Sequence, residues 1–508
     1  MSHEAIAIFM FASMMLTLFT GQRVFGAIGA VAAAAALMLW GTGGSDIPFS
    51  AAMKLMKWYP LLTLPMFIFM GYVLSESRIA DDLYKMFHVW MGSVSGGLAI
   101  GTIGLMVLIS AMNGLSVAGM AIGATIALPE LLKRGYDKRM VTGVIQAGSS
   151  LGILVPPSVV LVLYAMIARQ PVGQLWLAGV MPGLMMAGMF MLYIWLRCRL
   201  NPALGPTLAP EERAAFNRDL PLVINLALWA WGAMVVAFFW LIRRGIIALP
   251  DGQLTGLLVL IAVIGASVLV WRMRERLGPK ITIHMAEKYH LLLAGLLPLV
   301  IFFSMMVPFV NGWTSLTESS AIGAVVAFLA AVMKGRMTRE VFENSVRNTL
   351  AITCMFMWII VAAMGFGAVF DGLGAVRAID NLFTEQLGLD PWTILILMQL
   401  SFLIMGTFLD DTAMLVIVAP LYIPLVRHLG FDLIWYGVLY TITTQIAYMT
   451  PPFGYNLFLM RAMAPKEITL RDIYASIWPF VIVMVLALTI IMLVPEIALW
   501  LPHLIYNR

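Results

Sequence analysis

The amino-acid sequence predicts an all-α polytopic membrane protein with two inverted repeats, each containing a re-entrant hairpin and a broken helix. Three observations support this prediction. Apolar residues make up 62% and charged residues 11% of the 508-residue chain, whereas soluble domains are nearer half apolar and a quarter charged. Two apolar stretches are interrupted by a proline pair, and several landmarks recur at one interval along the chain.

The proline pairs lie within residues 144–163, VIQAGSSLGILVPPSVVLVL, and residues 439–458, LYTITTQIAYMTPPFGYNLF. A proline removes a backbone donor from a helix, and its ring clashes with the carbonyl one turn earlier. Two consecutive prolines therefore end one half-helix and begin another. Unpaired backbone at bilayer depth is tolerated only inside protein or beside a cavity. Two such breaks in corresponding halves of a chain indicate a transporter binding site.

Three kinds of landmark recur at an interval of about 295 residues, which predicts an internal repeat. The recurring pairs are Pro156 and Pro451, the Gly-aromatic-Asp triplets at 135–137 and 430–432, and Pro129 and Pro424. Each copy also has a polar or glycine-rich interruption upstream, Asn-Gly-Leu-Ser at 113–116 and Leu-Asp-Asp-Thr at 409–412. Chance is the alternative explanation, and several landmarks at one interval argue against it.

Apolar runs predict the first elements of the chain. Residues 4–20 and 24–40 predict two spans, and the first lacks the basic region and small-residue cleavage site of a signal peptide. Residues 46–56 predict an interfacial segment, because lysines and flanking aromatic residues are typical of headgroup level. Residues 60–74 predict a third span.

Residues 96–110 and 117–132 are each near span length, with Asn113 and Gly114 between them. They predict either a re-entrant hairpin or two full crossings. In the hairpin topology the basic clusters on both sides of the next broken helix and span lie on one face, which the positive-inside rule makes cytoplasmic. The hairpin is the preferred prediction.

This topology leaves few basic residues on the outer face of the first repeat. They are Lys54, Lys57 and Arg169. It also places the N-terminus and the C-terminus on the outer face of the membrane.

The second half of the chain predicts the same series of elements. Polar residues 204–219 predict a connector, and two extra spans follow it. We expect a first repeat at 1–203, an insertion at 204–290 and a second repeat at 291–508. The expected elements after residue 203 are spans 220–242, 254–271, 291–307, 319–333 and 349–369, hairpin 392–425, the broken helix and span 474–491. Five crossings in each repeat invert the second copy.

Residues 151–164, LGILVPPSVVLVLY, and residues 449–458, MTPPFGYNLF, together resemble the large membrane subunit of the TRAP transporters. Residues 406–432 are similar to the same family, and the resemblance covers most of the chain except roughly residues 204–289. It implies an elevator fold, Na⁺ coupling, a small four-helix membrane subunit and a periplasmic binding protein. The implied substrate is a small organic acid anion such as a C4-dicarboxylate.

The hairpin tips and helix breaks are the predicted site, because half-helix N-termini favour anions and C-terminal carbonyls favour cations. The predicted Na⁺ ligands are Asn113, Gly114, Ser116, Ser149, Gly152, Val155, Gly406, Asp410, Thr412, Thr444 and Thr450. The predicted substrate contacts are Asn113, Ser150, Pro156, Ser158, Asp411, Pro451 and Asn456. For each hydroxyl, the alternative is a bond back to its own helix.

Several functions are disfavoured. Cys198 and Cys354 suggest neither a disulfide framework nor a metal site. We find no nucleotide-binding loop, no nucleophile elbow and no cluster of titratable residues, so an enzyme is not expected. The net charge of +5 needs no nucleic acid to explain it. The alternatives are a self-sufficient sodium/carboxylate or sodium/proton carrier and, less favoured, a channel or membrane enzyme.

Overall fold

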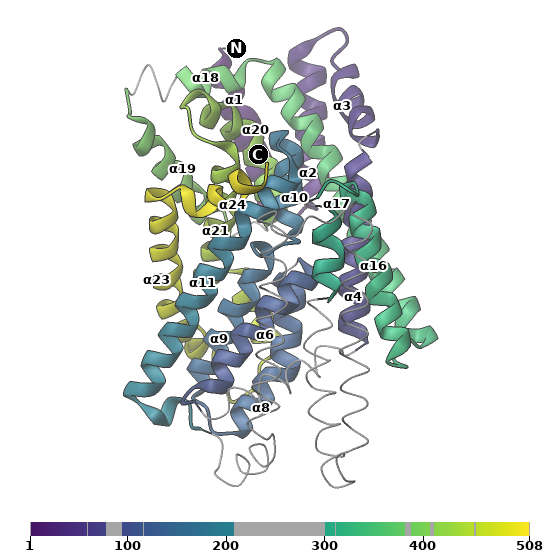
Figure 1. Ribbon diagram of the computed structural model, residues 1–508. Helices are drawn as coiled ribbons and strands as arrows, with labels where there is room; N and C mark the ends of the chain where they lie inside the picture. The colour runs from purple at the N-terminus through teal and green to yellow at the C-terminus, as the bar shows by residue number, and fades with distance from the viewer. Residues whose placement is uncertain are drawn as a thin grey trace, which may run out of the picture. The chain divides into compact units, whose positions relative to one another are not determined.

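The computed structural model describes residues 2–57, 59–77, 94–114, 116–207, 300–309, 311–381, 388–406, 411–451 and 454–506, which form helices and their connections (Figure 1). Met1–Thr207 and Ala294–Arg508 together make one compact unit. The expected spans at 220–242 and 254–271 lie outside the described residues, and the boundaries of the three expected segments stay a prediction.

Four described helices are long and apolar enough to cross a membrane by length and composition. They are α11 (Val172–Leu200), α16 (Leu316–Met333), α17 (Arg339–Gly372) and α23 (Leu470–Leu493). Two of them begin with reciprocal caps. Ser315 and Glu318 form a capping box at α16, and Thr469 and Asp472 form another at α23. The predicted all-α membrane class is confirmed.

The elements before the first hairpin follow the predicted order. They are α1 (His3–Phe19), α2 (Val24–Ala35) with the π-helix η1 (Ala36–Trp40), α3 (Asp46–Met56), the 3-10 turn η2 (Tyr59–Leu62) and α4 (Thr63–Glu76). The interfacial segment predicted at 46–56 coincides with α3. The third span begins at Thr63 rather than at residue 60, because the chain first makes a 3-10 turn.

One helix boundary was predicted wrongly, and two short helices were not predicted. Helix α17 runs from Arg339 to Gly372, so it begins well before the span expected at 349–369. Thr338 caps this start through its side chain, and a charged first turn carries no apolar signal. Helices α18 (Ala375–Asn381) and α24 (Glu496–Tyr506) were not predicted, since both are shorter than a membrane span.

Both hairpins and both broken helices are present. Hairpin 1 consists of α6 (Gly97–Asn113), α7 (Ser116–Ile122), the π-helix η3 (Gly123–Ala127) and α8 (Leu128–Lys133). Broken helix 1 consists of α9 (Lys138–Ser150), the 3-10 turn η4 (Leu151–Ile153) and α10 (Val159–Ala168). Hairpin 2 consists of α19 (Pro391–Met405) and α20 (Asp411–His428), and broken helix 2 of α21 (Leu433–Met449) and α22 (Tyr455–Met463).

The link between hairpin and broken helix has the same backbone form in both repeats. Gly135 and Gly430 have φ of 77° and 78°, the left-handed region that favours glycine after a helix. In each case the glycine and the next residue donate to the last turn of the preceding helix. Asp137 and Asp432 then cap α9 and α21 with their side chains. The repeat seen in the sequence is therefore a repeat of structure.

The length of α23 shows that the two copies are inverted. Near its start, Asp472 pairs with Lys138 Nζ at 2.7 Å, in the first turn of α9. Near its end, the carbonyl of Ile491 accepts from Trp435 Nε1 at 2.9 Å, in the first turn of α21. At 1.5 Å per residue these points are about 28 Å apart. The broken helices therefore begin at opposite ends of the unit, and α8 and α20, which lead into them, lie at opposite ends in Figure 1.

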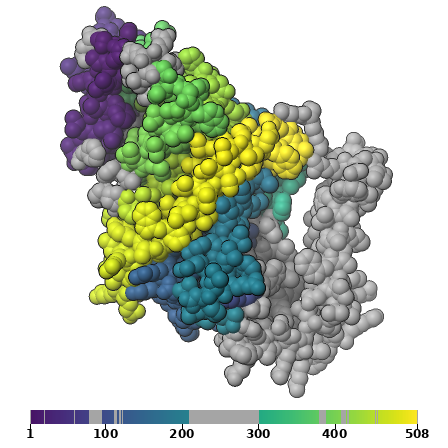
Figure 2. Space-filling view, turned by 90° about the vertical axis from the view of Figure 1, so that its left-hand side faces the viewer, coloured from purple at the N-terminus to yellow at the C-terminus, as the bar shows by residue number. Residues whose placement is uncertain are grey.

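The helices pack in two groups, each drawn from both halves of the chain. Helices α1 to α4 pack with α16, α17 and α18. The hairpins and broken helices pack with α11, α23 and α24. Figure 2 shows the C-terminal helices lying along α11 on one face, in agreement with their contacts. Among the described helices, α4, α17 and α18 make the most extensive contacts from the first group to the second.

Candidate functional site

The tip of hairpin 1 closes on the break of helix 1. The carbonyl of Gly114 accepts from the backbone N–H of Val159, the first residue of α10, at 3.3 Å. A Cβ at Gly114 would lie 2.1 Å from the carbonyl oxygen of Pro157, and φ there is +63°. Glycine is therefore required at this position by both space and conformation. Because residue 114 has no side chain, the tip of hairpin 1 can approach the break closely enough for the N–H of Val159 to donate to its carbonyl.

The other side of break 1 packs on α11. A Cβ at Gly179 would lie 2.5 Å from the carbonyl oxygen of Leu154, and one at Gly183 would lie 2.8 Å from Val155 Cγ2. Small residues four apart allow this close approach. The loop between α9 and α10 is thus enclosed by hairpin 1 on one side and α11 on the other.

Break 2 is packed in a similar way. Helix α21 ends at Met449, and Thr450 and Pro451 begin the turn that leads to α22. Gly406, at the end of the first arm of hairpin 2, approaches α21 closely. A Cβ there would lie 2.6 Å from Ala447 Cβ, less than one turn before the helix ends. The described end of this arm therefore lies against broken helix 2.

The two repeats exchange contacts at the breaks. Ser116 Oγ, at the start of the second arm of hairpin 1, donates to Asn456 Oδ1 in α22 at 3.4 Å. Helix α7 thereby contacts the second half of broken helix 2, and α20 contacts α10, the second half of broken helix 1. Each hairpin packs on its own repeat and on the broken helix of the other.

Buried amide groups with unpaired atoms gather on these elements. Gln146 Oε1, Gln399 Nε2, Asn456 Nδ2 and both polar side-chain atoms of Gln445 have no hydrogen-bond partner among the described residues. All four side chains are buried. An unpaired buried polar atom costs about 1–3 kcal/mol, and native proteins explain such atoms by water, ions or ligands. These amides therefore indicate a polar site between broken helices and hairpins.

Four predicted hydroxyls bond back to their own helices. Ser149 donates to the carbonyl of Gln146 at 2.9 Å, Ser150 to that of Ala147 at 2.8 Å, Thr444 to that of Thr441 at 2.8 Å and Thr450 to that of Ile446 at 2.7 Å. The alternative given for these residues is thus what the structure shows. A hydroxyl that donates its proton keeps two acceptor lone pairs, so cation binding remains chemically open to it.

The structure brings most of the predicted residues to the two breaks. Ser158 caps α10 and donates to the carbonyl of Ile153, Gly152 lies in η4, and Pro156 lies in the loop that follows. The backbone of Asn113, Asp411 and Thr412 lies at the helix ends facing the tips. The side chains of these three residues, and all of Asp410, lie outside the described residues. Their roles stay predictions.

Sequence reasoning missed the glutamines. Gln146 and Gln445 interrupt the apolar first halves of the broken helices, and Gln399 interrupts the first arm of hairpin 2. A neutral amide within an apolar run was the available signal. Gln399 Oε1 accepts from Thr443 Oγ1 at 2.5 Å, which links hairpin 2 to α21.

Arg461, in the last turn of α22, has a structural role. Its Nη1 donates to the carbonyl of Ile468 at 2.8 Å. It thus stabilises the link between α22 and α23. Among the described residues no group of three His, Cys, Asp or Glu side chains could hold a metal ion.

Replacing Gly114 by alanine should destabilise the protein strongly. Alanine in the left-handed region costs about 1–2 kcal/mol, and here the Cβ also meets a backbone oxygen at 2.1 Å. Gly335→Ala is the matched control, since φ is +65° there and nothing lies within 4 Å of the Cβ. The apparent unfolding temperature in detergent should fall clearly further for Gly114→Ala. Equal shifts would contradict the close contact between tip and break.

Known proteins give an independent comparison. Residues 11–249 and 248–497 match the family model described as "Tripartite ATP-independent periplasmic transporter, DctM component". The C4-dicarboxylate TRAP transporter large permease protein DctM of Pseudomonas aeruginosa is 27% identical over 448 residues, 88% of this chain and 86% of that protein. The ectoine TRAP transporter large permease protein TeaC of Halomonas elongata is 25% identical over 471 residues, 93% of this chain and 92% of that protein.

A solved structure has a similar fold. The crystal structure of the YdaH transporter of Alcanivorax borkumensis covers 91% of this chain and 90% of its own, with a TM-score of 0.56 and 15% identity. The family model covers most of the sequence, and the relatives are transporter permeases rather than enzymes. This chain therefore belongs to the DctM family, the large permease components of tripartite ATP-independent periplasmic transporters.

Proposed function

We propose that this chain is the permease of a sodium-coupled tripartite system that imports a small organic acid anion across the bacterial inner membrane. The observation that carries the proposal is the group of buried amides with unpaired atoms beside the two helix breaks. The surrounding protein is strongly apolar, and polar groups inside a membrane protein are functional by default.

The two breaks supply helix ends of both kinds. Helices α9 and α21 end at the breaks, so their C-terminal carbonyls favour a cation. Helices α10 and α22 begin there, so their N-terminal amides favour an anion. A sodium ion and a carboxylate bound side by side would also attract each other. This pairing supports symport of Na⁺ with an organic anion.

The grouping of the helices supports an elevator mechanism. The hairpins and broken helices pack together with α11, α23 and α24, while α1 to α4 pack with α16 to α18. In the proposed motion the group of hairpins and broken helices moves past the group of α1 to α4 and α16 to α18, and it carries the site with it. Each hairpin packs against the broken helix of the other repeat, which favours movement of the hairpins and broken helices as one rigid body.

The proposed partners follow from the family description, which names a tripartite system. They are a small four-helix membrane subunit and a periplasmic substrate-binding protein. A C4-dicarboxylate and ectoine are named for two relatives, and we propose an organic acid of this size for this chain. The separate binding protein would make the choice among such substrates.

Uptake into proteoliposomes should require an inward sodium gradient together with the binding protein and the small subunit. Removing sodium should abolish uptake, because the oxygen ligands at the breaks would lose the cation that compensates the substrate charge. The measurement is the initial rate of uptake with each ion gradient imposed separately. Equal uptake driven by a proton gradient in the absence of sodium would exclude sodium coupling.

Asp410→Asn should raise the sodium concentration needed for half-maximal uptake and leave the folded yield nearly unchanged. The sequence places Asp410 between two apolar arms, where a carboxylate costs several kcal/mol unless it has a partner or a wet cavity. Asp411→Asn is the control and should have the smaller effect, because Asp411 is the first residue of α20, where an acidic residue is favoured by the helix N-terminus. An unaltered sodium dependence in Asp410→Asn would remove that charge from the coupling site.

The proposed orientation can be tested by cysteine labelling. Lys54→Cys and Arg377→Cys should react with a membrane-impermeant maleimide added to the periplasmic side, because both lie on the face with few basic residues. Lys138→Cys and Arg339→Cys should react only after the membrane is permeabilised. The reverse pattern would place both chain termini in the cytoplasm.

A further inference from the structure

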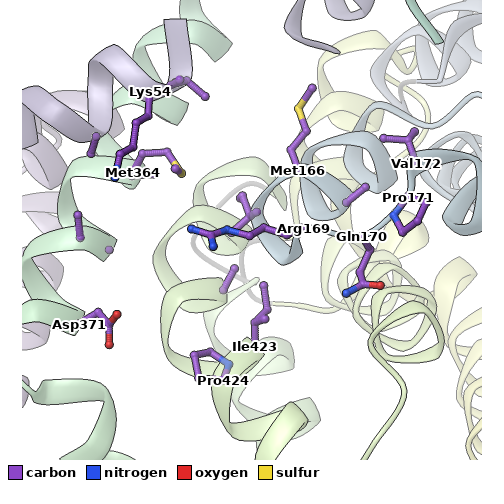
Figure 3. A pocket seen from close by; sticks show the side chains of 18 of the residues that line it. Lys54, Met166, Arg169, Gln170, Pro171, Val172, Met364, Asp371, Ile423 and Pro424 are labelled. Carbon is purple, nitrogen blue, oxygen red and sulfur yellow. The ribbon is translucent and has the colours of Figure 1, made fainter. Parts of the chain in front are cut away.

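A large cavity lies away from the breaks, between α3 and α17 on one wall and the α10–α11 link with α20 on the other (Figure 3). Its volume is 1230 Å³, more than a small organic acid needs, since ligand pockets are about 300–1,000 Å³. Phe309, Leu316 and Tyr506 also line it. The two walls belong to the two helix groups described above.

Two of the three basic residues that the topology leaves on the outer face of the first repeat line this cavity. They are Lys54, on α3, and Arg169, at the end of α10. Figure 3 shows both side chains directed into the space. Neither makes an ion pair or hydrogen bond that the structure records among the described residues. Two of the few basic residues on the outer face, Lys54 and Arg169, therefore line the same cavity.

Arg169 is held in an unusual conformation. With φ of +54° it is the one described non-glycine residue in the left-handed region. That conformation costs about 1–2 kcal/mol for a residue with a Cβ and is often kept for function. It ends α10 and aims the side chain across the cavity toward the other wall, as Figure 3 shows.

The charges differ between the walls. Among the described residues, Arg169 is the one charged residue that lines its wall, while Asp46, Lys54 and Asp371 line the α3 and α17 wall. A ligand spanning the cavity would therefore place a carboxylate at Arg169 and Lys54 and a hydrogen-bond donor at Asp371. A carboxylate bound by guanidinium and ammonium groups makes charge-assisted hydrogen bonds.

We propose that this cavity is an outer receiving site for a small organic acid that also carries a hydroxyl or cationic group. Arg169 binds its carboxylate, Lys54 supports that contact, and Asp371 accepts from the donor group. The site rests on the proposed function in that it holds the substrate after release from the binding protein and before it reaches the breaks. It is separate from the amides at the breaks and needs no sodium.

The test uses ligand protection of a cysteine in the cavity wall. Ser50 lines the cavity on α3, and Met53 is exposed on the same helix outside it. Ser50→Cys and Met53→Cys are made in the full chain with Cys198 and Cys354 replaced by alanine. Maleimide labelling rates are measured in detergent without sodium, with malate or ectoine as the probe and choline chloride at equal ionic strength as the reference.

At a probe concentration twice its Kd, mass action should slow labelling of Ser50→Cys about threefold and leave Met53→Cys unchanged. Adding Arg169→Gln should remove the protection, and Arg169→Lys should restore part of it. Lys57→Gln, which changes an exposed lysine outside the cavity, should keep it. Asn456→Ala should also keep it while uptake falls, which separates this site from the breaks.

Two results would overturn the proposal. The first is labelling of Ser50→Cys that neither malate nor ectoine slows relative to choline chloride. The second is protection that survives Arg169→Gln. Protection without sodium-dependent uptake would instead support the receiving site and contradict the proposed coupling, so the two failures are distinguishable.

Discussion

A helix that breaks inside a membrane leaves backbone groups unpaired, and the bilayer offers them no partner. The rest of this structure depends on how that requirement is met. Helix α9 ends at Ser150, before the Pro-Pro pair, and after the pair the backbone N–H of Val159 donates to the carbonyl of Gly114 at the tip of hairpin 1. Since this contact leaves no room for a Cβ, the tip must be glycine. Hairpin and broken helix are therefore one packing unit.

The inverted orientation of the two repeats brings their hairpins and broken helices together. Because the two broken helices begin at opposite ends of α23, each hairpin passes its own broken helix and reaches the second half of the other. Two carbonyl ends, two amide ends and several buried amides then lie on elements that pack against one another. A single copy would supply only one end of each kind, so the proposed site requires both repeats.

Local chemistry explains which parts of the fold the sequence could predict. Proline pairs, glycines with positive φ and aspartate caps act over one or two turns, so the breaks and hairpins were predictable, and α3 was predictable from its lysines and flanking aromatic residues. Contacts such as Ser116 with Asn456 join residues 340 positions apart and depend on packing that no local pattern encodes. The glutamines were missed although a neutral amide within an apolar run marked their positions, because only the packing shows that their amide atoms are buried and unpaired. Short α24 was missed because its length is below a span.

The most direct test of this account is a cross-link between hairpin 1 and broken helix 2. Ser116→Cys and Asn456→Cys would be combined in a chain with Cys198 and Cys354 replaced by alanine, oxidised in the membrane and digested for mass spectrometry. The account predicts a disulfide-linked peptide from this pair and none from Ser116→Cys with Gly335→Cys. If both thiols are shown to be reactive and the 116–456 disulfide is absent, the contact between hairpin 1 and the second half of broken helix 2 is contradicted.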